Sequence, residues 1–380
     1  MSEDVFILKN IDEIDSADFS EYIKELLSFR SRDIEVFLSW NALNFYRKKP
    51  RIERSFKGVD VFTIRAYILG KDIHLESFSG VEVPIRIVAN PSIAIKDEHV
   101  DIYLRLSSLG SHPIPNPWSR TFIGLARTSL QLLRNRIELR VEPLLYPYVS
   151  IERVEDPRIV PETNELYHVR AYEFYRPISN TTSYTITFRS IVNEHGIPKN
   201  LEPVRFRWID GSEHIIRDYR DTFPLNKDYM VIRPWIEGLG IGMIMIAPRS
   251  SAVVDIRDIR SYPEFVPNEN ERKTGGNCST KLSSNEYIVI FHSVDKYFGC
   301  YYTYIAILDS NGELLGITPK PVITPRVRDY FGARPATVFV CGAQIVKDKL
   351  IVSAGKDDEI TLILEADIDR VIEMMKFIRG

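Results

Sequence analysis

From Val59 onward, the chain alternates between short runs of β-branched or aromatic residues and breaks that contain Gly, Pro, Asn or Asp. This pattern predicts β-strands joined by turns. The predicted strands span residues 61–69, 81–88, 100–106, 121–126, 137–141, 166–174, 184–188, 204–208, 229–232, 241–246, 252–256, 287–291, 301–308, 337–340, 350–352 and 360–364.

Many of these runs are apolar at consecutive positions, as in Ile241-Gly242-Met243-Ile244-Met245-Ile246. A strand with two apolar faces needs cover on both sides. Helical patterns do not alternate regularly with the runs, which argues against a parallel α/β sheet. An all-β propeller meets both conditions, because each blade is packed between two neighbours.

Helical patterns are confined to the two ends of the chain. A capping candidate at 16–18 precedes apolar residues at helical spacing, and a second helical pattern runs from about 33 to 46. Residues 366–378 predict a closing amphipathic helix. We therefore expect an N-terminal helical extension over residues 1–58, a propeller over 59–365 and a C-terminal helix over 366–380.

Composition narrows the possible partners. With 49 basic and 52 acidic residues, the net charge of −3 does not favour nucleic acid or an anionic membrane as a partner. The three cysteines have no CxxC spacing, so neither a zinc ribbon nor a disulfide framework is expected. The chain also lacks a secretory signal pattern and an apolar stretch of membrane-spanning length, and we expect a cytoplasmic protein.

Several apolar runs end on a polar residue that needs an explanation. Arg105, Arg233 and His292 each follow such a run. A buried arginine requires an acceptor, because an unpaired one costs several kcal/mol. Each residue taken alone fits an internal salt bridge as well as a ligand site.

Spacing favours a shared site. Asn90, Asp156, Arg220, Lys281 and Gly342 stand in short polar motifs that recur every 61 to 66 residues. Such a repeat suits five blades, each of which contributes one polar segment to an axial pocket.

Glu155-Asp156-Pro157-Arg158 is the sharpest local motif. Two acids before a rigid proline and an arginine can hold one carboxylate at a fixed angle, although a surface turn with an ion pair fits equally well. Metal-ligand spacing, HExxH and GxSxG are absent from the sequence, so no metal site or serine nucleophile is expected.

In their order along the chain, these motifs resemble glycoside hydrolase family 130, the β-mannoside phosphorylases and related β-mannosidases, which are five-bladed propellers. The resemblance covers about residues 81–364. It is carried by Asn90-Pro91, Ile102–Arg105, Phe122–Ser129, Glu155–Ile159, Arg220–Pro224, Met230–Pro234, Gly275-Gly276, Lys281, Phe291-His292, Val338–Gly342 and Gly355–Asp358.

The resemblance implies a role for each matching residue. Asp156 would be the general acid that protonates the departing glycosidic oxygen, relayed through a hydroxyl of the bound mannose. Asn90, Arg105 and Asp358 would hold that mannose. The phosphate pocket would consist of Arg220, Arg233, Lys281 and His292. No cofactor is implied, because inorganic phosphate is the co-substrate.

Physical chemistry agrees with this division of labour. Phosphate is already an anionic nucleophile, so phosphorolysis needs one proton-transfer carboxylate, whereas an inverting hydrolase needs a second one to activate water. A cluster of cations suits phosphate and would impair a water-activating base. Cations close to Asp156 would lower its pKa, so we expect them on the opposite side of the sugar ring.

The expected activity is inverting phosphorolysis of β-linked manno-oligosaccharides to α-mannose 1-phosphate. A hydrolytic β-mannosidase and a non-catalytic glycan-binding propeller remain alternatives. Departures from the family pattern, Cys278-Ser279-Thr280, Pro335-Ala336-Thr337 and Ser293, suggest a reshaped aglycone side. The N-terminal helices are candidates for contacts within a homo-oligomer.

Overall fold

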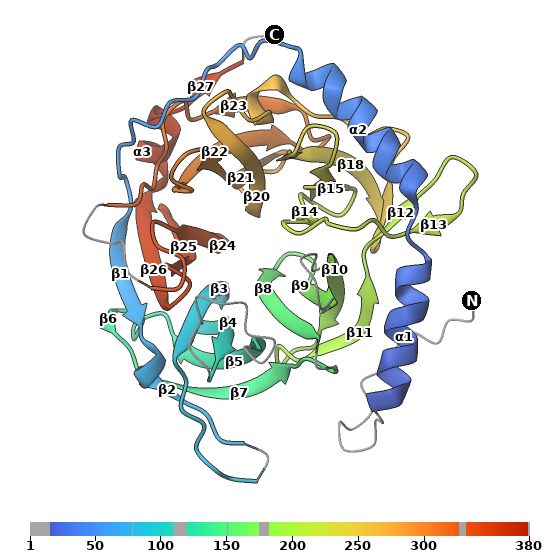
Figure 1. The fold of residues 1–380 in the computed structure, drawn as a ribbon. Coiled ribbons are helices and arrows are strands. Elements are labelled where there is room, and N and C mark those ends of the chain that lie inside the picture. The colour runs from blue at the N-terminus through green and yellow to red at the C-terminus, as the bar shows by residue number, and fades with distance from the viewer. Residues whose placement is uncertain are drawn as a thin grey trace.

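Five blades, whose four inner strands pair antiparallel, form a ring in the computed structural model, which describes residues 16–77, 79–108, 120–149, 151–174, 182–326 and 332–378 (Figure 1). In the sheet of each blade, one edge strand lies near the axis of the ring and the opposite edge strand lies at the rim. The five-bladed propeller predicted from the sequence is thereby confirmed.

From the axis outward, the blades consist of the following strands. The first blade contains β3 (Ile87–Lys96), β4 (His99–Ser107), β5 (Phe122–Ser129), β7 (Leu139–Leu145) and β2 (Ile73–His74). The second contains β8 (Glu152–Val160), β9 (Glu165–Phe174), β10 (Thr182–Val192) and β11 (Pro198–Pro203). The third contains β14 (Phe223–Pro224), β15 (Tyr229–Ile232), β18 (Met245–Ser250), β19 (Val253–Asp255), β12 (Arg205–Arg207) and β13 (Glu213–His214).

The last two blades use strands from both ends of the chain. The fourth contains β20 (Glu271–Lys281), β21 (Glu286–Asp295), β22 (Tyr301–Asp309), β23 (Leu314–Ile317) and β27 (Lys376–Phe377). The fifth contains β24 (Val338–Val346), β25 (Lys349–Lys356), β26 (Ile360–Asp367), β1 (Thr63–Ile68) and β6 (Asn135–Arg136). Because β1 pairs antiparallel with β26, an early strand completes the last blade and closes the ring.

The core is divided among the five junctions between blades. Along 243–246, Met243 and Met245 pack in the cluster between the second and third blades, whereas Ile244 and Ile246 pack between the third and fourth. Successive strand residues point to opposite faces, so an uninterrupted apolar run satisfies both neighbours of a blade. This packing explains the apolar runs from which the propeller was predicted.

Two helices lie along the outside of the ring, α1 (Ser16–Ser28) and α2 (Arg32–Tyr46) (Figure 1). The side chain of Ser31 caps α2 by accepting a hydrogen bond from the backbone N–H of Ile34, at 3.3 Å. Ile34, Leu38 and Ala42 form the buried face of α2, which packs into the core between the second and third blades. The predicted helices of the extension are thus present, and residues 1–15 lie outside the described part of the chain.

Some predicted elements differ from the structure. The closing helix expected over 366–378 is only the short α3 (Ile368–Glu373), because the chain then extends as β27 and pairs with β23. The run 241–246 divides between β17 (Ile241–Gly242), which pairs with β16 (Trp235–Ile236), and β18. The strand expected at 81–88 lies later, as β3, and neither β8 nor β20 was predicted.

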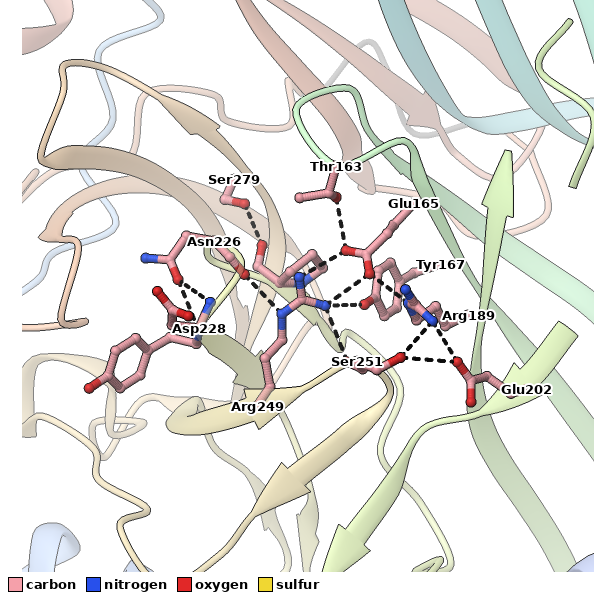
Figure 2. A network of polar contacts seen from close by, with 12 residues as sticks. Thr163, Glu165, Tyr167, Arg189, Glu202, Asn226, Asp228, Arg249, Ser251 and Ser279 are labelled. Atoms are coloured by element: carbon pink, nitrogen blue, oxygen red, sulfur yellow. Dashed lines mark hydrogen bonds and ion pairs between the residues drawn. The ribbon is translucent and has the colours of Figure 1, made fainter. Parts of the chain in front are cut away.

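An ion cluster joins the second and third blades at the end of the ring where β8 ends (Figure 2). The buried Glu165 of β9 accepts hydrogen bonds from Arg189 Nε at 2.6 Å and from Arg249 Nη2, on β18, at 2.9 Å. Burial opposes ionisation of Glu165, but the hydrogen bond from Arg249 and the two arginine charges outweigh it and lower the pKa of this carboxyl. Glu165 therefore binds Arg189 of its own blade and also Arg249 across the junction with the third blade.

We expect Glu165→Gln to reduce the free energy of unfolding by about 3–5 kcal/mol, because Arg249 loses its counter-charge in a largely buried place, whereas Arg189 keeps Glu202. Urea denaturation at neutral pH measures the loss. The matched control is Glu142→Gln, since Glu142 is exposed and lies 3.3 Å from Arg127; its effect should be about 1 kcal/mol or less. Equal midpoints for the two variants would contradict the role of the cluster.

Candidate active site

A polar cavity of about 210 Å³ opens on the axis of the ring. Four innermost strands contribute residues to it, namely β3, β8, β20 and β24. In each strand, these residues lie in the first half or directly before it. We call this end of the ring the cavity face and the opposite end the far face. The lining residues are Asn90, Arg105, Arg153, Glu155, Asp156, Arg220, Asp221, Lys273, Tyr301, Arg334, Thr337, Phe339 and Asp358.

Asn90 and Asp156 occupy equivalent irregular positions in neighbouring blades. Each has a left-handed backbone, with φ of 46° and 52°, and each precedes a proline. The strand register shifts at both places, which marks a β-bulge. Left-handed backbone at a non-glycine residue costs about 1–3 kcal/mol, and a bulge redirects side chains. The strained bulges thus turn both side chains toward the cavity.

The two side chains meet there. Asn90 Nδ2 donates to Asp156 Oδ1 at 2.7 Å, and Arg105 Nη1 lies 3.5 Å from the same oxygen. Arg105 also bonds Glu155 at 3.0 Å and lies 3.9 Å from Asp358. A Cβ at Gly355 would come within 2.4 Å of the Asn90 backbone nitrogen, so only glycine leaves space for the Asn90 bulge. The proposed acid and the three proposed sugar-binding residues therefore lie together.

The adjacent carboxyl groups of Glu155 and Asp156 have opposite pKa shifts. Burial raises the pKa of Asp156; Arg105 opposes this shift and the charge of Glu155 adds to it. Burial also disfavours ionised Glu155, but Arg105, Arg153 and other arginines outweigh it and lower the pKa of Glu155 to about 2. Asp156 is accordingly the carboxyl that keeps a proton to higher pH, as a general acid requires.

A group of cations also lines the cavity. Arg220 donates to Thr185 Oγ1 at 3.0 Å and lies 3.6 Å from Asp218. Lys273 and Arg334 face the ring of Tyr301, at 5.3 and 4.8 Å from its centroid. Within the described part of the chain, neither Lys273 nor Arg334 has a carboxylate partner.

The electrostatics of this group favour an anion. Burial, followed by the charge of Arg233 and those of Arg334 and Arg220, lowers the pKa of Lys273 well below its usual range, although Asp221 opposes the shift. A bound anion would relieve the repulsion and restore the ammonium form. The cation group, which consists of Arg220, Lys273 and Arg334, can therefore bind an anion.

The position of Arg233 does not agree with the expectation that this residue binds phosphate directly. Its guanidinium is buried behind the cavity wall and donates twice to Asp221 Oδ2, at 3.1 and 2.8 Å. Asp221 also accepts from the buried Arg158 at 2.9 Å. Although burial opposes ionisation, these arginines keep the pKa of Asp221 well below its usual range. Arg233 thus forms part of an internal ion cluster that supports the cavity wall.

His292 also lies outside the cavity lining. Its Nδ1 is 3.0 Å from Asn277 Oδ1, and burial lowers its pKa well below the usual value, so the ring is neutral. A Cβ at Gly275 would lie 2.6 Å from this ring and 2.8 Å from Asp221 Oδ2, so glycine is required where β20 passes over them. His292 therefore packs beside the Asp221 cluster and adds no positive charge.

Lys281 lies far from the cavity. It is the exposed last residue of β20, at the far face, whereas Lys273 is the third residue of the same strand. Eight residues of extended chain separate the two by about 26 Å. The lysine of the cavity is Lys273, and sequence analysis missed it together with Arg334 and Tyr301. The run of polar and small residues from Lys273 to Asn277 was the available signal, but it was not recognised as a strand.

The arrangement can perform proton transfer beside a bound anion. The described residues contain no group of three or more side chains that could hold a metal ion. The chemistry available in the cavity is that of carboxyl, guanidinium, ammonium and phenol groups.

In the described part of the chain, no helix has the length and apolar character needed to span a membrane.

A family model described as beta-1,4-mannooligosaccharide phosphorylase matches residues 52–377. The fold is similar to that of a beta-1,2-mannobiose phosphorylase from Listeria innocua, with a TM-score of 0.56 and 17% identity over 77% of this chain and 92% of the other. It is also similar to the mannose phosphorylase MPT-4 from Leishmania mexicana, solved with phosphate (0.51, 16%, 92% and 98%). A glycosyl hydrolase from Bacteroides ovatus is a third such structure (0.52, 13%, 85% and 95%).

No curated protein matches the chain by sequence. The likenesses in structure concern the fold, since all three identities are low. The family match is evidence of membership in the family, because it spans the complete propeller. On this match the protein belongs to glycoside hydrolase family 130, whose members are phosphorylases or glycoside hydrolases acting on mannosides.

Proposed function

We propose that this protein catalyses inverting phosphorolysis of β-linked manno-oligosaccharides. The observation that carries the proposal is the pairing, in one cavity, of a carboxyl with a raised pKa and a cation group without carboxylate partners for Lys273 and Arg334. The products are α-mannose 1-phosphate and an oligosaccharide shortened by one mannose.

The reaction assigns separate tasks to the two sides of the cavity. Asn90, Arg105 and Asp358 hold the terminal mannose, and a phosphate oxygen attacks its anomeric carbon. The bond from that carbon to the glycosidic oxygen breaks, and the proton of Asp156 passes to the departing oxygen through a mannose hydroxyl. Asp156 then regains a proton from solvent. Inversion follows because the phosphate approaches from the side opposite the leaving group.

Phosphate would bind to Arg220, Lys273 and Arg334, with the Tyr301 hydroxyl as a further donor. Guanidinium groups bind phosphate oxygens through paired hydrogen bonds, and an ammonium adds a compact charge. Arg233 and His292 are assigned a supporting role through the Asp221 cluster, in place of direct contact. Lys281 has no part in this binding.

The carboxylates favour phosphate over water as the nucleophile. An inverting hydrolase needs a carboxylate that can accept a proton from water. Glu155, with its pKa lowered to about 2, and Asp221, with its pKa lower than usual, are weak bases. Hydrolysis is the runner-up because Asp358 also lines the cavity and offers a third carboxylate.

Incubation with β-mannobioses of different linkage should release mannose 1-phosphate only when inorganic phosphate is present. Asp156→Asn should reduce this turnover by about 10²–10⁴-fold, because the proton donor is lost. Asp97→Asn is the matched control, since Asp97 also has a left-handed backbone but lies in the far-face turn after β3. Undiminished sugar release without phosphate would establish hydrolysis instead. No turnover in either buffer would favour a glycan-binding protein.

Lys273→Met should raise the KM for phosphate by about 10–150-fold, the range expected for a lost hydrogen bond to a charged group. The KM for the mannoside should change much less, because the lysine lies on the phosphate side. Lys281→Met tests the competing assignment on the same strand and should leave both constants unchanged. Steady-state kinetics with each substrate varied in turn distinguishes the two lysines.

Asp156→Asn should also stabilise the fold at neutral pH. A carboxyl with a raised pKa in the folded state contributes stability while it is protonated, and this contribution is lost as pH rises through that pKa. Asparagine resembles the protonated form and can still accept the hydrogen bond from Asn90. Urea midpoints should therefore be higher for the variant at pH 7 and converge with those of the wild type near pH 3. A lower midpoint at pH 7 would contradict the raised pKa.

A further inference from the structure

One amine lies among the polar groups of the cavity. Of the described residues that line the cavity, only Lys273 has an amine in its side chain. This lysine is half-buried in the first half of β20, and its Nζ lies 5.3 Å from the centre of the Tyr301 ring. The amine is therefore accessible to a small molecule that enters the cavity.

The surroundings of Lys273 make its amine reactive. A lysine with an ordinary pKa of ~10.4 is an ammonium ion at neutral pH, and it has no lone pair with which to attack an electrophile. Burial and the charges of the neighbouring arginines lower the pKa of Lys273 well below that range. A desolvated lysine beside other cations is an activated nucleophile. When no anion is bound beside it, Lys273 can therefore form a covalent bond.

The cations near Lys273 can stabilise a negative product. Arg334 lies 4.8 Å from the centre of the same Tyr301 ring, and Arg220 lies 3.6 Å from Asp218. The charges of both arginines act on the lysine. A guanidinium group binds a carboxylate-like anion through two parallel hydrogen bonds. A negative group at the end of the Lys273 side chain would therefore supply the anion that this part of the cavity lacks.

Carbon dioxide is the electrophile that these surroundings favour. An aldehyde would convert the amine into an imine, which is neutral or, when protonated, positively charged, and the cations would remain without an anion. Carbon dioxide instead yields a carbamate. The amine nitrogen bonds to the carbon, one carbon–oxygen π bond becomes a lone pair on oxygen, and the nitrogen releases a proton to solvent. The neutral amine thus becomes a group with one negative charge, and no further reactant is needed.

We propose that Lys273 is a modification site at which carbon dioxide forms a carbamate, and that the carbamate binds to Arg220 and Arg334. The two carbamate oxygens have the geometry of a carboxylate, which suits both guanidinium groups. Carbon dioxide is uncharged and small relative to the cavity volume of about 210 Å³. The modification itself does not require that the protein cleave mannosides.

Carbon dioxide and phosphate exclude each other in this arrangement. Each of them places an anion among the same cations. A bound phosphate also returns Lys273 to the ammonium form, which does not react with carbon dioxide. Carbon dioxide is therefore an inhibitor that competes with phosphate, and this part of the inference rests on the proposed function.

Carbon-13 NMR of the full chain in labelled bicarbonate at neutral pH, without phosphate, tests the modification. The wild type should show a carbamate resonance that is distinct from those of carbon dioxide and bicarbonate. Lys273→Arg should lose this resonance, because it keeps the positive charge but has no amine. Lys281→Met is the matched control and should retain it, since Lys281 is the exposed last residue of the same strand. Alkylation of the carbamate to a stable ester, followed by peptide mass spectrometry, identifies the modified residue.

Inorganic phosphate tests the competition. Its addition should abolish the Lys273-dependent resonance of the wild type. In phosphorolysis assays, carbon dioxide should raise the KM for phosphate and leave kcat unchanged at saturating phosphate. Lys273→Arg should lose this dependence on carbon dioxide. Far-UV circular dichroism verifies that each variant is folded.

The possible results lead to different conclusions. Identical spectra for the wild type and Lys273→Arg would overturn the proposal, because other amines would then account for any carbamate. A KM that rises with bicarbonate, without a Lys273-dependent resonance, would also overturn it, since bicarbonate would then bind only as an ion. If the wild type releases no mannose 1-phosphate but shows the Lys273-dependent resonance, the proposed reaction fails while the modification site stands.

Discussion

The structure depends on placing ionised groups at the axis of a ring whose blades are held together by apolar packing. An isolated buried charge costs several kcal/mol, so each one needs a partner or a ligand. Asp221 meets part of this requirement, because its two carboxylate oxygens pair with Arg158 and Arg233 inside the wall. The cations that remain, Lys273 and Arg334, face the cavity, where only a ligand can complete them. The boundary between the internal ion cluster and the cation group therefore separates charges that are paired inside the protein from charges that are open to the cavity.

The same environment acts in opposite directions on two adjacent carboxyls. Glu155 faces Arg105 and Arg153, and their attraction exceeds the effect of burial. Asp156 has a longer contact with Arg105, at 3.5 Å, and a neutral partner in Asn90, so burial prevails. The left-handed bulge at Asp156 makes this possible, because it turns the acid away from the direction that a regular strand would give it. Backbone strain and proton affinity are thus linked at a single residue.

The middle strands of the blades were predictable from sequence, whereas the innermost strands β8 and β20 and rim strands such as β11 and β23 were not. The middle strands bury both faces between neighbouring blades and therefore show apolar runs, as in β9, β15 and β22. β8 and β20 line the axis, so their sequences carry the polar and small residues of the site, including Glu155, Asp156, Lys273 and Gly275. The family motifs identified Asp156, Asn90, Arg105 and Asp358, which do lie together. The motifs could not reveal that Lys281 lies at the opposite end of β20, because that depends on strand direction.

Strand direction also decides how this fold can vary its substrates. Every innermost strand that contributes to the cavity begins at the cavity face, so the reacting groups are fixed by the ring itself. In the third and fourth blades, the segments between the second and third strands emerge at the same face and contribute no residue to the cavity lining, so they can change without disturbing it; in the fifth blade, the corresponding turn carries Asp358. The β16–β17 hairpin and the docked helix α2 are such variable segments, because they line a separate hollow beside the cavity and the ring does not need them for closure. These segments can therefore vary while the side chains at the axis stay in place, because blade packing constrains them least.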